Sequence, residues 1–497
     1  MERDTAVIEA VSAALTGSTV AGSYADNATL YATRLDPSRF PASFVQFLYE
    51  NQVDPSVYDL QQPLPRYVRW VTSSGFKSKG HAAPARAPML QSISAASLGS
   101  DLCMDVTGDQ AQLAFHKSVV GDLQHLDHDP ARQLAALHAS GLPSARPTWL
   151  PGIYALDPAQ GLASNVLYKA GHLCGLDIAS GAALAALDAQ PGDHVLDLCC
   201  APGAKMCWLI EHVSGVPGNP SFRLPSKPSD PLPGTVTGVD ISEHRLTISR
   251  GLLRKFHPQA PARLYHADGT TFRVGAPARV GPALRPMADA AASSPEPPMR
   301  PFHASKLVRG SPTDFSGIYG SAVFLYDRVI VDAECTHDAS LVHLVKQQAG
   351  DWVDVARFMD PQRLASLAQL QYALLENGFR LLKPGGVLVY STCSFARAQN
   401  EDIVARLLAA YPDTARLEAV PGAEAWPVAP RPPRSPSLSP TRDAALQAVD
   451  AMTLRFTPRH SQTSGFFLAR LRKVADEDDE DDNFRLSHSP PKRQCRF

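Results

Sequence analysis

The stretch "DHVLDLCCAPGAKMCWLIEHV", residues 193–213, decides the fold of this 497-residue chain. Residues 193–198 form a short apolar run typical of a buried strand, and residues 204–213 place their apolar side chains on one helical face. Between them, Pro202-Gly203 predicts a tight turn that opens a helix. The helix N–H groups there can face a carboxylate, although an ordinary strand–helix turn explains the stretch as well.

The same alternation of strands and helices continues along the chain. We expect strands at 235–240, 262–268, 326–334, 387–393 and 464–473, and helices at 242–256 and 361–386, the second closed by Gly385. Strands that alternate with helices predict a parallel, doubly wound α/β sheet.

Composition separates folded from unfolded segments. Proline makes up 43 of the 497 residues, about 9% against a usual ~5%. The excess predicts loop or disordered inserts near 215–234, 275–314 and 420–460, and the end of the chain, 474–497, reads as a charged disordered tail. The net charge of −2 gives no strongly basic signature, so any surface that binds nucleic acid must be local.

The expected location is inside the cell, in the nucleus or cytoplasm. No stretch reaches the ~18 consecutive apolar residues of a membrane span, and the acidic N-terminus resembles neither a secretory signal nor a transit peptide. The eight cysteines are too sparse for a disulfide scaffold, which favours reduced thiols. We expect no membrane association.

Acidic residues end four of the expected strands: Asp197, Asp240, Asp268 and Asp332. Ligands of such sheets bind at the carboxyl ends of the strands, and an acid after the second strand can accept hydrogen bonds from ribose hydroxyls. The turn at 199–205 has a single glycine and is not GxGxxG, which disfavours a pyrophosphate-bearing nucleotide. The four carboxylates predict an adenosine-bearing cofactor.

Two cysteines fall at the ends of neighbouring expected strands. Cys335 follows "YDRVIVDAE" (326–334), and Cys393 lies within "VYSTCSFARAQNE" (389–401). A lone cysteine is more often a small buried hydrophobe, but two at strand ends beside acids favour reactive thiols. Paired CxxC or HxxxH spacing is absent, so we expect no metal site. The remaining candidates are interpreted as structural: Cys174, Cys199, Cys200 and Cys207.

These motifs resemble those of the Sun-domain RNA (cytosine-5) methyltransferases. "DLCCAPGAK" resembles the S-adenosylmethionine motif DxCAAPGGK, "VDISEHR" the ribose-binding motif and "HADGT" the adenine-side motif. "VDAECTHD" resembles DAPCSG, and "YSTCSFARAQNE" resembles YSTCSxxxxENE. Including "WLPGIYALDPAQ" before them and "TSGFFLARLRK" after them, the resemblance covers residues 149–473.

The resemblance implies a Rossmann-like class I methyltransferase core over 149–473 and an N-terminal accessory region, 1–148, that positions RNA. The implied activity is transfer of a methyl group from S-adenosyl-L-methionine to carbon 5 of a cytosine in tRNA or rRNA. A catalytically weak RNA-binding relative and a methyltransferase for a protein or DNA acceptor remain alternatives. Both cysteines are present, which argues for activity.

Cytosine carbon 5 is a poor nucleophile until a thiolate adds to carbon 6, and a base must later remove the carbon 5 proton. By resemblance, Cys393 is the attacking thiol, Cys335 assists product release, and Asp332 contacts the cytosine ring. Lys205 lies near the site, where its charge can lower the pKa of a thiol. The implied cofactor-binding residues are Cys199, Cys200, Ala201, Pro202, Gly203, Ala204, Lys205, Asp240, Arg245, Asp268 and Asp332.

The chain departs from the family pattern at several positions. Glu334 replaces a proline, Thr336 a serine and Ala204 a glycine. A carboxylate beside a thiol raises its pKa, so we expect Cys335 to be the less acidic of the two cysteines. The local basic residues that remain for RNA are Arg66, Arg69, Lys77, Lys79, Arg245, Arg250, Arg254 and Lys255.

Overall fold

The computed structural model describes most of the expected core. It covers residues 32–71, 129–214, 233–257, 260–277, 299–305, 308, 325–353, 355, 359–430 and 440–475, apart from the side chains of 440–445. The insert expected near 215–234, the tail at 474–497, and Lys77 and Lys79 lie wholly or almost wholly outside the described residues. Of the insert expected near 275–314, residues 275–277, 299–305 and 308 are described, and they include a short strand at His303–Ala304.

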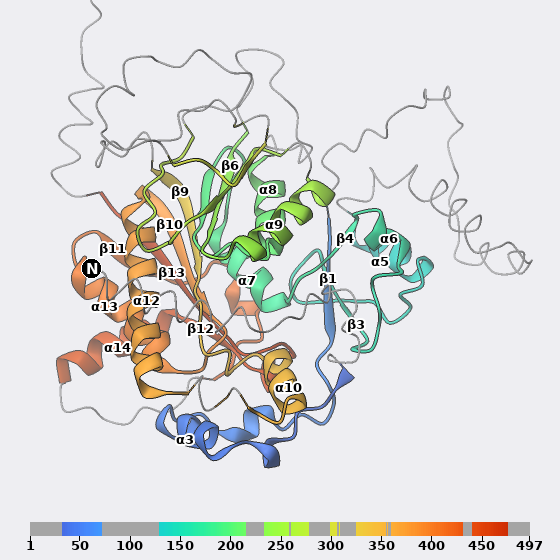
Figure 1. Ribbon diagram of the computed structural model, residues 1–497, viewed down its shortest axis with the longest axis horizontal. Coiled ribbons are helices and arrows are strands. Elements are labelled where there is room, and N and C mark those ends of the chain that lie inside the picture. The colour runs from blue at the N-terminus through green and yellow to red at the C-terminus, as the bar shows by residue number, and fades with distance from the viewer. Residues whose placement is uncertain are drawn as a thin grey trace, which may run out of the picture.

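Within the described residues, nine strands form the larger sheet, in the order β11-β13-β10-β9-β5-β6-β7-β8, with β12 paired to β13 (Figure 1). Their bounds are β5 (His194–Asp197), β6 (Thr235–Asp240), β7 (Ala262–His266), β8 (His303–Ala304), β9 (Tyr326–Asp332), β10 (Leu382–Thr392), β11 (Ala415–Glu418), β12 (Leu454–Phe456) and β13 (Phe466–Lys473). The five strands from β10 to β7 are mutually parallel, so their carboxyl ends meet at one edge.

Helices cover both faces of this sheet, which is why its strands are nearly continuous apolar runs. One face carries α7 (Ile178–Leu187), α8 (Ala204–Val213) and α9 (Glu243–Phe256) in one apolar cluster. The other carries α12 (Pro361–Arg380), α13 (Glu401–Ala410) and α14 (Pro440–Met452) (Figure 1). The α/β fold class predicted from the sequence is confirmed.

Three details of the prediction are wrong. The sheet is mixed, because β13 runs antiparallel between β10 and β11. The helix expected over 361–386 ends at Arg380, and Gly385, at φ +79°, instead serves a register shift inside β10. The insert expected near 420–460 contains α14 and β12 after residue 439, whose buried Val449 and Phe456 join the core. The proline-rich sequence next to these two elements predicted a loop in their place.

A second, four-stranded sheet has the order β2-β3-β1-β4. Its strands are β1 (Arg66–Trp70), β2 (Arg146–Pro147), β3 (Ile153–Leu156) and β4 (Leu173–Gly175), accompanied by α5 (Pro130–Ala139) and α6 (Val166–Lys169). Strand β1 pairs with both β3 and β4, so the domain boundary expected between 148 and 149 cuts through this sheet. Pairing between distant segments is not visible in a local sequence pattern.

A buried ion pair joins the small sheet to the core. Arg69 of β1 donates two hydrogen bonds to Glu211 of α8, at 2.6 and 2.7 Å. Both side chains are about 95% buried, where loss of one partner would leave an unpaired charge. Arg66 is also buried and donates to the carbonyl of Gln160. These two arginines therefore hold the fold together, and the expectation that they face RNA is wrong.

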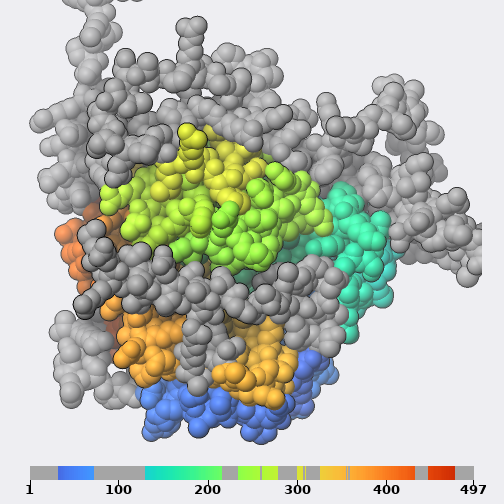
Figure 2. All heavy atoms as spheres, viewed as in Figure 1, coloured from blue at the N-terminus to red at the C-terminus, as the bar shows by residue number. Residues whose placement is uncertain are grey.

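The N-terminal helix α3 (Ala42–Glu50) packs beside α10 (Leu341–Ala349), more than 290 residues later in the chain. Phe44 and Trp352 stack with ring centroids 6.1 Å apart. Figure 2 shows the blue N-terminal atoms against the orange ones along the lower edge of the molecule. A further short helix, α15 (Pro458–Ser461), precedes β13. None of the helices in the described ranges is both long and apolar enough to cross a bilayer.

Candidate active site

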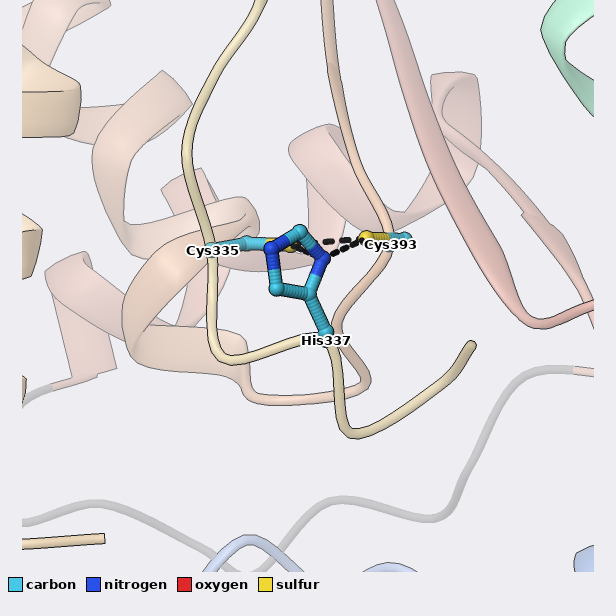
Figure 3. A group of neighbouring side chains, drawn as sticks. All are labelled: Cys335, His337 and Cys393. Carbon is cyan, nitrogen blue, oxygen red and sulfur yellow. Dashed lines mark hydrogen bonds between the residues drawn. The ribbon is translucent and has the colours of Figure 1, made fainter. Parts of the chain in front are cut away.

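The two candidate cysteines meet because β9 and β10 are adjacent, parallel and in register. Asp332, the last residue of β9, pairs with Ser391 of β10, so the chain beyond each strand leaves the sheet at the same level. Cys335 and Cys393 lie just past these ends, with their sulfur atoms 2.9 Å apart (Figure 3). Cys335 is fully buried and Cys393 is partly exposed, so a ligand can reach Cys393 more readily.

A histidine completes this cluster. The Nδ1 atom of His337 lies 2.8 Å from Sγ of Cys393 and 3.6 Å from Sγ of Cys335 (Figure 3). The backbone of His337 has φ +54°, a left-handed conformation that favours glycine. Its ring stacks on that of His343 from α10, with centroids 4.3 Å apart. Stacking on His343 therefore fixes the ring next to the sulfur atoms.

The two thiols titrate as a pair. Burial opposes ionisation of Cys335, but hydrogen bonds from Cys393 and His337 outweigh it and hold its pKa well below the ordinary value. The pKa of Cys393 is raised well above its ordinary value, because Cys393 donates to Cys335, is buried, and faces the charge on Cys335. The dyad loses its first proton readily and holds its second tightly.

This order overturns the expectation that Glu334 makes Cys335 the less acidic thiol. The Glu334 carboxylate lies 3.6 Å from Arg363, and burial raises its pKa, which weakens its charge. The lowered pKa of Cys335 also has Cys393 and His337 as its main causes, rather than Lys205. Lys205 does not decide the pKa of Cys393, because the hydrogen bond to Cys335 and burial raise it.

Lys205 instead forms an ion pair beside the cysteines. Its Nζ atom lies 2.6 Å from one carboxylate oxygen of Asp332, and the hydroxyl of Ser391 donates to the other at 2.7 Å. Both partners of the ion pair are about a fifth exposed. Asp332 is thus fixed at the rim of the site by contacts from α8 and β10, with part of its surface available to a ligand.

The QNE end of the last motif holds the two cysteine loops. The amide of Gln399 bonds both the backbone N–H and the hydroxyl of Thr336, at 3.2 and 3.0 Å. Asn400 accepts from the hydroxyl of Thr392 and donates to the carbonyl of Ser394, on either side of Cys393. The motif residues therefore act on the position of the thiols rather than on the chemistry directly.

The expected cofactor turn lies across the ends of β5 and β6. The backbone N–H of Ala201 donates to Asp240 at 3.1 Å, and Arg245 donates to the carbonyl of Ala201 at 2.6 Å. The Asp240 side chain is only 4% exposed and accepts a second backbone N–H, from Ser242. Any ribose contact by Asp240 must use the remaining lone pairs of a carboxylate that already orients the turn.

Other members of the cofactor set have clear structural places. Gly203 begins α8 at φ +103°, and an added Cβ there would lie 3.0 Å from Ser249, so Pro202-Gly203-Ala204 packs directly on α9. Cys199 and Cys200 are both held by backbone bonds, to Asp197 and to the carbonyl of Val239. Asp268 caps its own turn by accepting from Thr270, and no hydrogen bond between described residues links it to Asp240.

The donor and acceptor set of this edge fits a cationic ligand that carries hydroxyl and amino groups. Asp197 has one carboxylate oxygen that is buried and has no hydrogen-bond partner among the described residues, an arrangement that native proteins rarely leave unexplained. Burial raises the pKa of Asp197 to about 7. With Asp240, Asp268 and Asp332, it gives the edge an excess of acceptors that a cation with N–H and O–H donors would satisfy.

Known proteins with similar sequences are RNA methyltransferases by name. Residues 303–472 match the family described as 16S rRNA methyltransferase RsmB/F. Over these residues the chain is similar to the RsmB/F methyltransferases. This confirms the resemblance predicted from the motifs, over a shorter span than the expected 149–473.

Two relatives illustrate the extent of the RsmB/F similarity. A mitochondrial tRNA (cytosine(34)-C(5))-methyltransferase from Danio rerio is 26% identical over 238 residues, covering 48% of this chain and 46% of that protein. A ribosomal RNA small subunit methyltransferase F from Cronobacter sakazakii is 32% identical over 165 residues, covering 33% and 29%. The chain therefore spans less than half the length of each relative.

Solved structures give a weaker likeness. A methyltransferase homologue from Pyrococcus horikoshii is 18% identical, covers 88% of this chain and 100% of its own, and has a TM-score of 0.47. NSun6 from the same organism, solved with SFG, is 17% identical, covers 65% and 60%, and has a TM-score of 0.39. The description of the fold therefore rests on the sheet order and the site geometry given above, and not on these likenesses.

Sequence reasoning missed one residue of the RsmB/F-like site, His337. It occupies the last position of "DAECTH", where the quoted motif DAPCSG has glycine, and its left-handed backbone fits that glycine. A histidine in place of a motif glycine, two residues after a candidate thiol, was the available signal.

Proposed function

We propose that this chain is an S-adenosyl-L-methionine-dependent methyltransferase that forms 5-methylcytosine in RNA through a covalent Cys393–cytosine intermediate. The observation that carries the proposal is the meeting of two thiols, 2.9 Å apart, at the edge of the sheet that also bears the Lys205–Asp332 pair. The names of the relatives indicate tRNA or rRNA as the substrate, and an RNA substrate would place the protein inside the cell.

The acceptor-rich ends of β5, β6 and β7 would hold the cofactor, with Asp240 and the turn at 199–205 on the ribose side. Bound there, S-adenosyl-L-methionine supplies a methyl group on a sulfonium sulfur. Arg245 and Asp240 keep the turn closed around this position through their bonds to Ala201. Asp332, at the end of β9, lies between the cofactor turn and the cysteines, because Lys205 of α8 bonds it directly.

The target cytosine must leave any base stack to reach Cys393. The thiolate of Cys393 would add to carbon 6, and the electron pair released into the ring would make carbon 5 nucleophilic. Asp332, partly exposed and fixed by Lys205 and Ser391, would orient the ring through its polar edge. After methyl transfer, Cys335 would take the proton from carbon 5, which allows the bond between carbon 6 and Cys393 to break.

The proposal is tested by incubating the full chain with cofactor and total cellular RNA, followed by base-resolution mapping of 5-methylcytosine. Cys393→Ala should abolish the signal, and Cys174→Ala, which removes a buried thiol of the small sheet, is the matched control. Undiminished 5-methylcytosine with Cys393→Ala would sink the assignment. If the wild-type chain binds RNA but methylates none, the result would favour a catalytically weak RNA-binding relative. If it methylates DNA or protein in preference to RNA, the result would favour a methyltransferase for another acceptor.

A further inference from the structure

His337 lies against the sulfur atom that must become a nucleophile. Its Nδ1 atom is 2.8 Å from Sγ of Cys393, clearly closer than to Sγ of Cys335 at 3.6 Å. Among the hydrogen bonds between described residues, Cys393 Sγ has only these two partners, His337 and Cys335. Cys335 readily carries the negative charge of the dyad. If Cys393 also loses its proton, two thiolates lie side by side, and a proton bound to His337 offsets their repulsion. His337 is therefore the contact that can accept the proton of Cys393.

The fold holds His337 in a strained conformation to make this contact. A non-glycine residue at φ +54° is strained, and such strain is kept where the surrounding structure serves a function. The ring is fixed on one side by stacking on His343, whose Nδ1 in turn bonds the hydroxyl of Ser340 at 2.8 Å. Burial and the neighbouring His337 lower the pKa of His343 well below its ordinary value, so His343 is a neutral platform.

We propose that His337 is a further catalytic residue, the proton acceptor that converts the Cys393 thiol into the attacking thiolate and later restores it. The inference rests on the proposed function for its chemistry. In the first step the S–H bond of Cys393 breaks, its electron pair stays on Sγ, and the proton bonds to Nδ1 of His337. The sulfur electron pair then forms the bond to carbon 6 of the cytosine.

The return step balances the first. When Cys335 takes the carbon 5 proton, the electrons of that C–H bond form the ring double bond, and the electrons of the C–S bond return to Cys393. His337 gives its proton back to Cys393, and Cys335 releases to solvent the one proton that methylation of a C–H bond produces. Burial opposes protonation of His337, but the charge of Cys335, its hydrogen bond and the charge of Glu334 together raise the pKa of His337 above its ordinary value, which favours the first step.

A shared metal ion explains the same cluster less well. The ligand atoms of Cys335, His337 and Cys393 lie within 4.8 Å of one another. Two thiolates bound to one tetrahedral zinc at ~2.3 Å each would lie about 3.8 Å apart. The observed separation of 2.9 Å is shorter than this, so the two sulfur atoms do not have the spacing of a pair of thiolates on one zinc.

Several titratable or charged groups face His337 and set its behaviour with pH. They are Glu334 and Cys335 on its own loop, Cys393 beyond β10, His343 on α10, and Arg245 on α9. A test must therefore report on Cys393 itself rather than on overall activity alone. Alkylation by iodoacetamide does so, because it requires the thiolate and its site can be located by peptide mass spectrometry.

The test compares wild type, His337→Gly and the control Gln52→Gly, which also replaces a residue at φ +57° but lies in the N-terminal region. Glycine suits both backbones, so neither variant should be prevented from folding, and circular dichroism and thermal unfolding would verify that both are folded. His337→Gly should slow Cys393 alkylation at neutral pH about tenfold and slow methylation about 100-fold, within the range of general base catalysis. Added imidazole should restore part of both rates, whereas Gln52→Gly should change neither.

A folded His337→Gly protein whose Cys393 alkylates at the wild-type rate across the pH range would overturn the proposal. If the wild-type chain methylates no RNA, the proposed function fails, but the alkylation and imidazole measurements still decide whether His337 takes the proton of Cys393. Stoichiometric zinc in the purified protein, lost in His337→Gly, would also overturn it in favour of a metal site.

Discussion

The cofactor end and the thiol end of the same sheet edge are built in different ways. At the ends of β5, β6 and β7, Asp197, Asp240 and Asp268 each accept a backbone N–H from a residue two positions later. At the ends of β9 and β10, the contacts that matter join residues 56–63 positions apart: Cys335 with Cys393, His337 with Cys393, and Thr336 with Gln399.

The difference explains which end tolerates sequence change. A local turn is specified by a few consecutive residues, so the motif at 199–205 stays recognisable with Ala204 in place of glycine. The thiol end depends on two loops held in register, and substitutions in one loop can be accommodated by the other. The contact of His337 with Cys393 is an accommodation of that kind, and Glu334 is paired by Arg363 of the neighbouring helix α12. The predictions below test this contrast, from the largest expected effect to the smallest.

The largest effect is expected at the thiol end. In the Cys335→Ala variant the base proposed for the carbon 5 proton is gone, so turnover should stop after the first methyl transfer. The variant should accumulate protein–RNA adducts that survive a denaturing gel, and the double variant Cys335→Ala/Cys393→Ala should form none. Absence of any adduct with the single variant would count against the release role of Cys335.

The next effect concerns the cofactor end and depends on pH. Because burial raises the pKa of Asp197 to about 7, the folded state favours the neutral carboxyl. Its contribution to stability is complete below the unfolded pKa of ~3.9 and is lost as the pH rises through about 7. Asp197→Asn, which keeps an oxygen to accept from Cys199, should therefore be more stable than wild type at pH 8, by at most about 4 kcal/mol.

Urea denaturation at pH 5 and pH 8 checks the Asp197 prediction, with Asp193→Asn as a partly buried control. The stability difference between Asp197→Asn and wild type should grow from the lower to the higher pH. An equal difference at both values would show that Asp197 is ionised at both. Methylation should fall in the same variant, because the acceptor-rich edge loses a charge near the cofactor.

A smaller effect is expected from the link between the two thiol loops. Gln399→Ala leaves the buried N–H and hydroxyl of Thr336 without their amide partner, which should cost about 1–3 kcal/mol of stability. The rate of methylation should fall more than cofactor affinity, because the change moves Cys335 and leaves the turn at 199–205 in place. Equal losses in cofactor affinity and rate would contradict the separation of the two ends.

The smallest effect is expected for Glu334→Gln. The Glu334 carboxylate faces Arg363, so its removal should shift the pH midpoint for the first ionisation of the thiol pair by less than about half a pH unit. The measurement is the ultraviolet absorbance of the thiolate over a pH series, with His337→Gly as the variant that should shift the profile strongly. A large downward shift with Glu334→Gln would show that the charge of Glu334 raises the pKa of Cys335 after all.

Much of the core could be predicted from sequence because it follows local periodicity. The bounds of α8 and β6 agree with the predicted 204–213 and 235–240, since each is a complete apolar pattern between turn residues. The antiparallel placement of β13 and the short elements α14 and β12 could not be predicted in this way. Their formation depends on pairing with β10 and β13 and on burial of Val449 and Phe456, which no local window contains.

The sequence by itself determined the α/β alternation, the acids at the strand ends and the two cysteines, because each is written in consecutive residues. Only the tertiary structure decided that Arg66 and Arg69 are internal, that Cys335 rather than Cys393 carries the dyad's charge, and that His337 reaches Cys393. Burial, proton sharing and a 2.8 Å contact are properties of groups brought together from distant positions. They arise when parallel strands align their ends, and they have no counterpart in the order of residues along the chain.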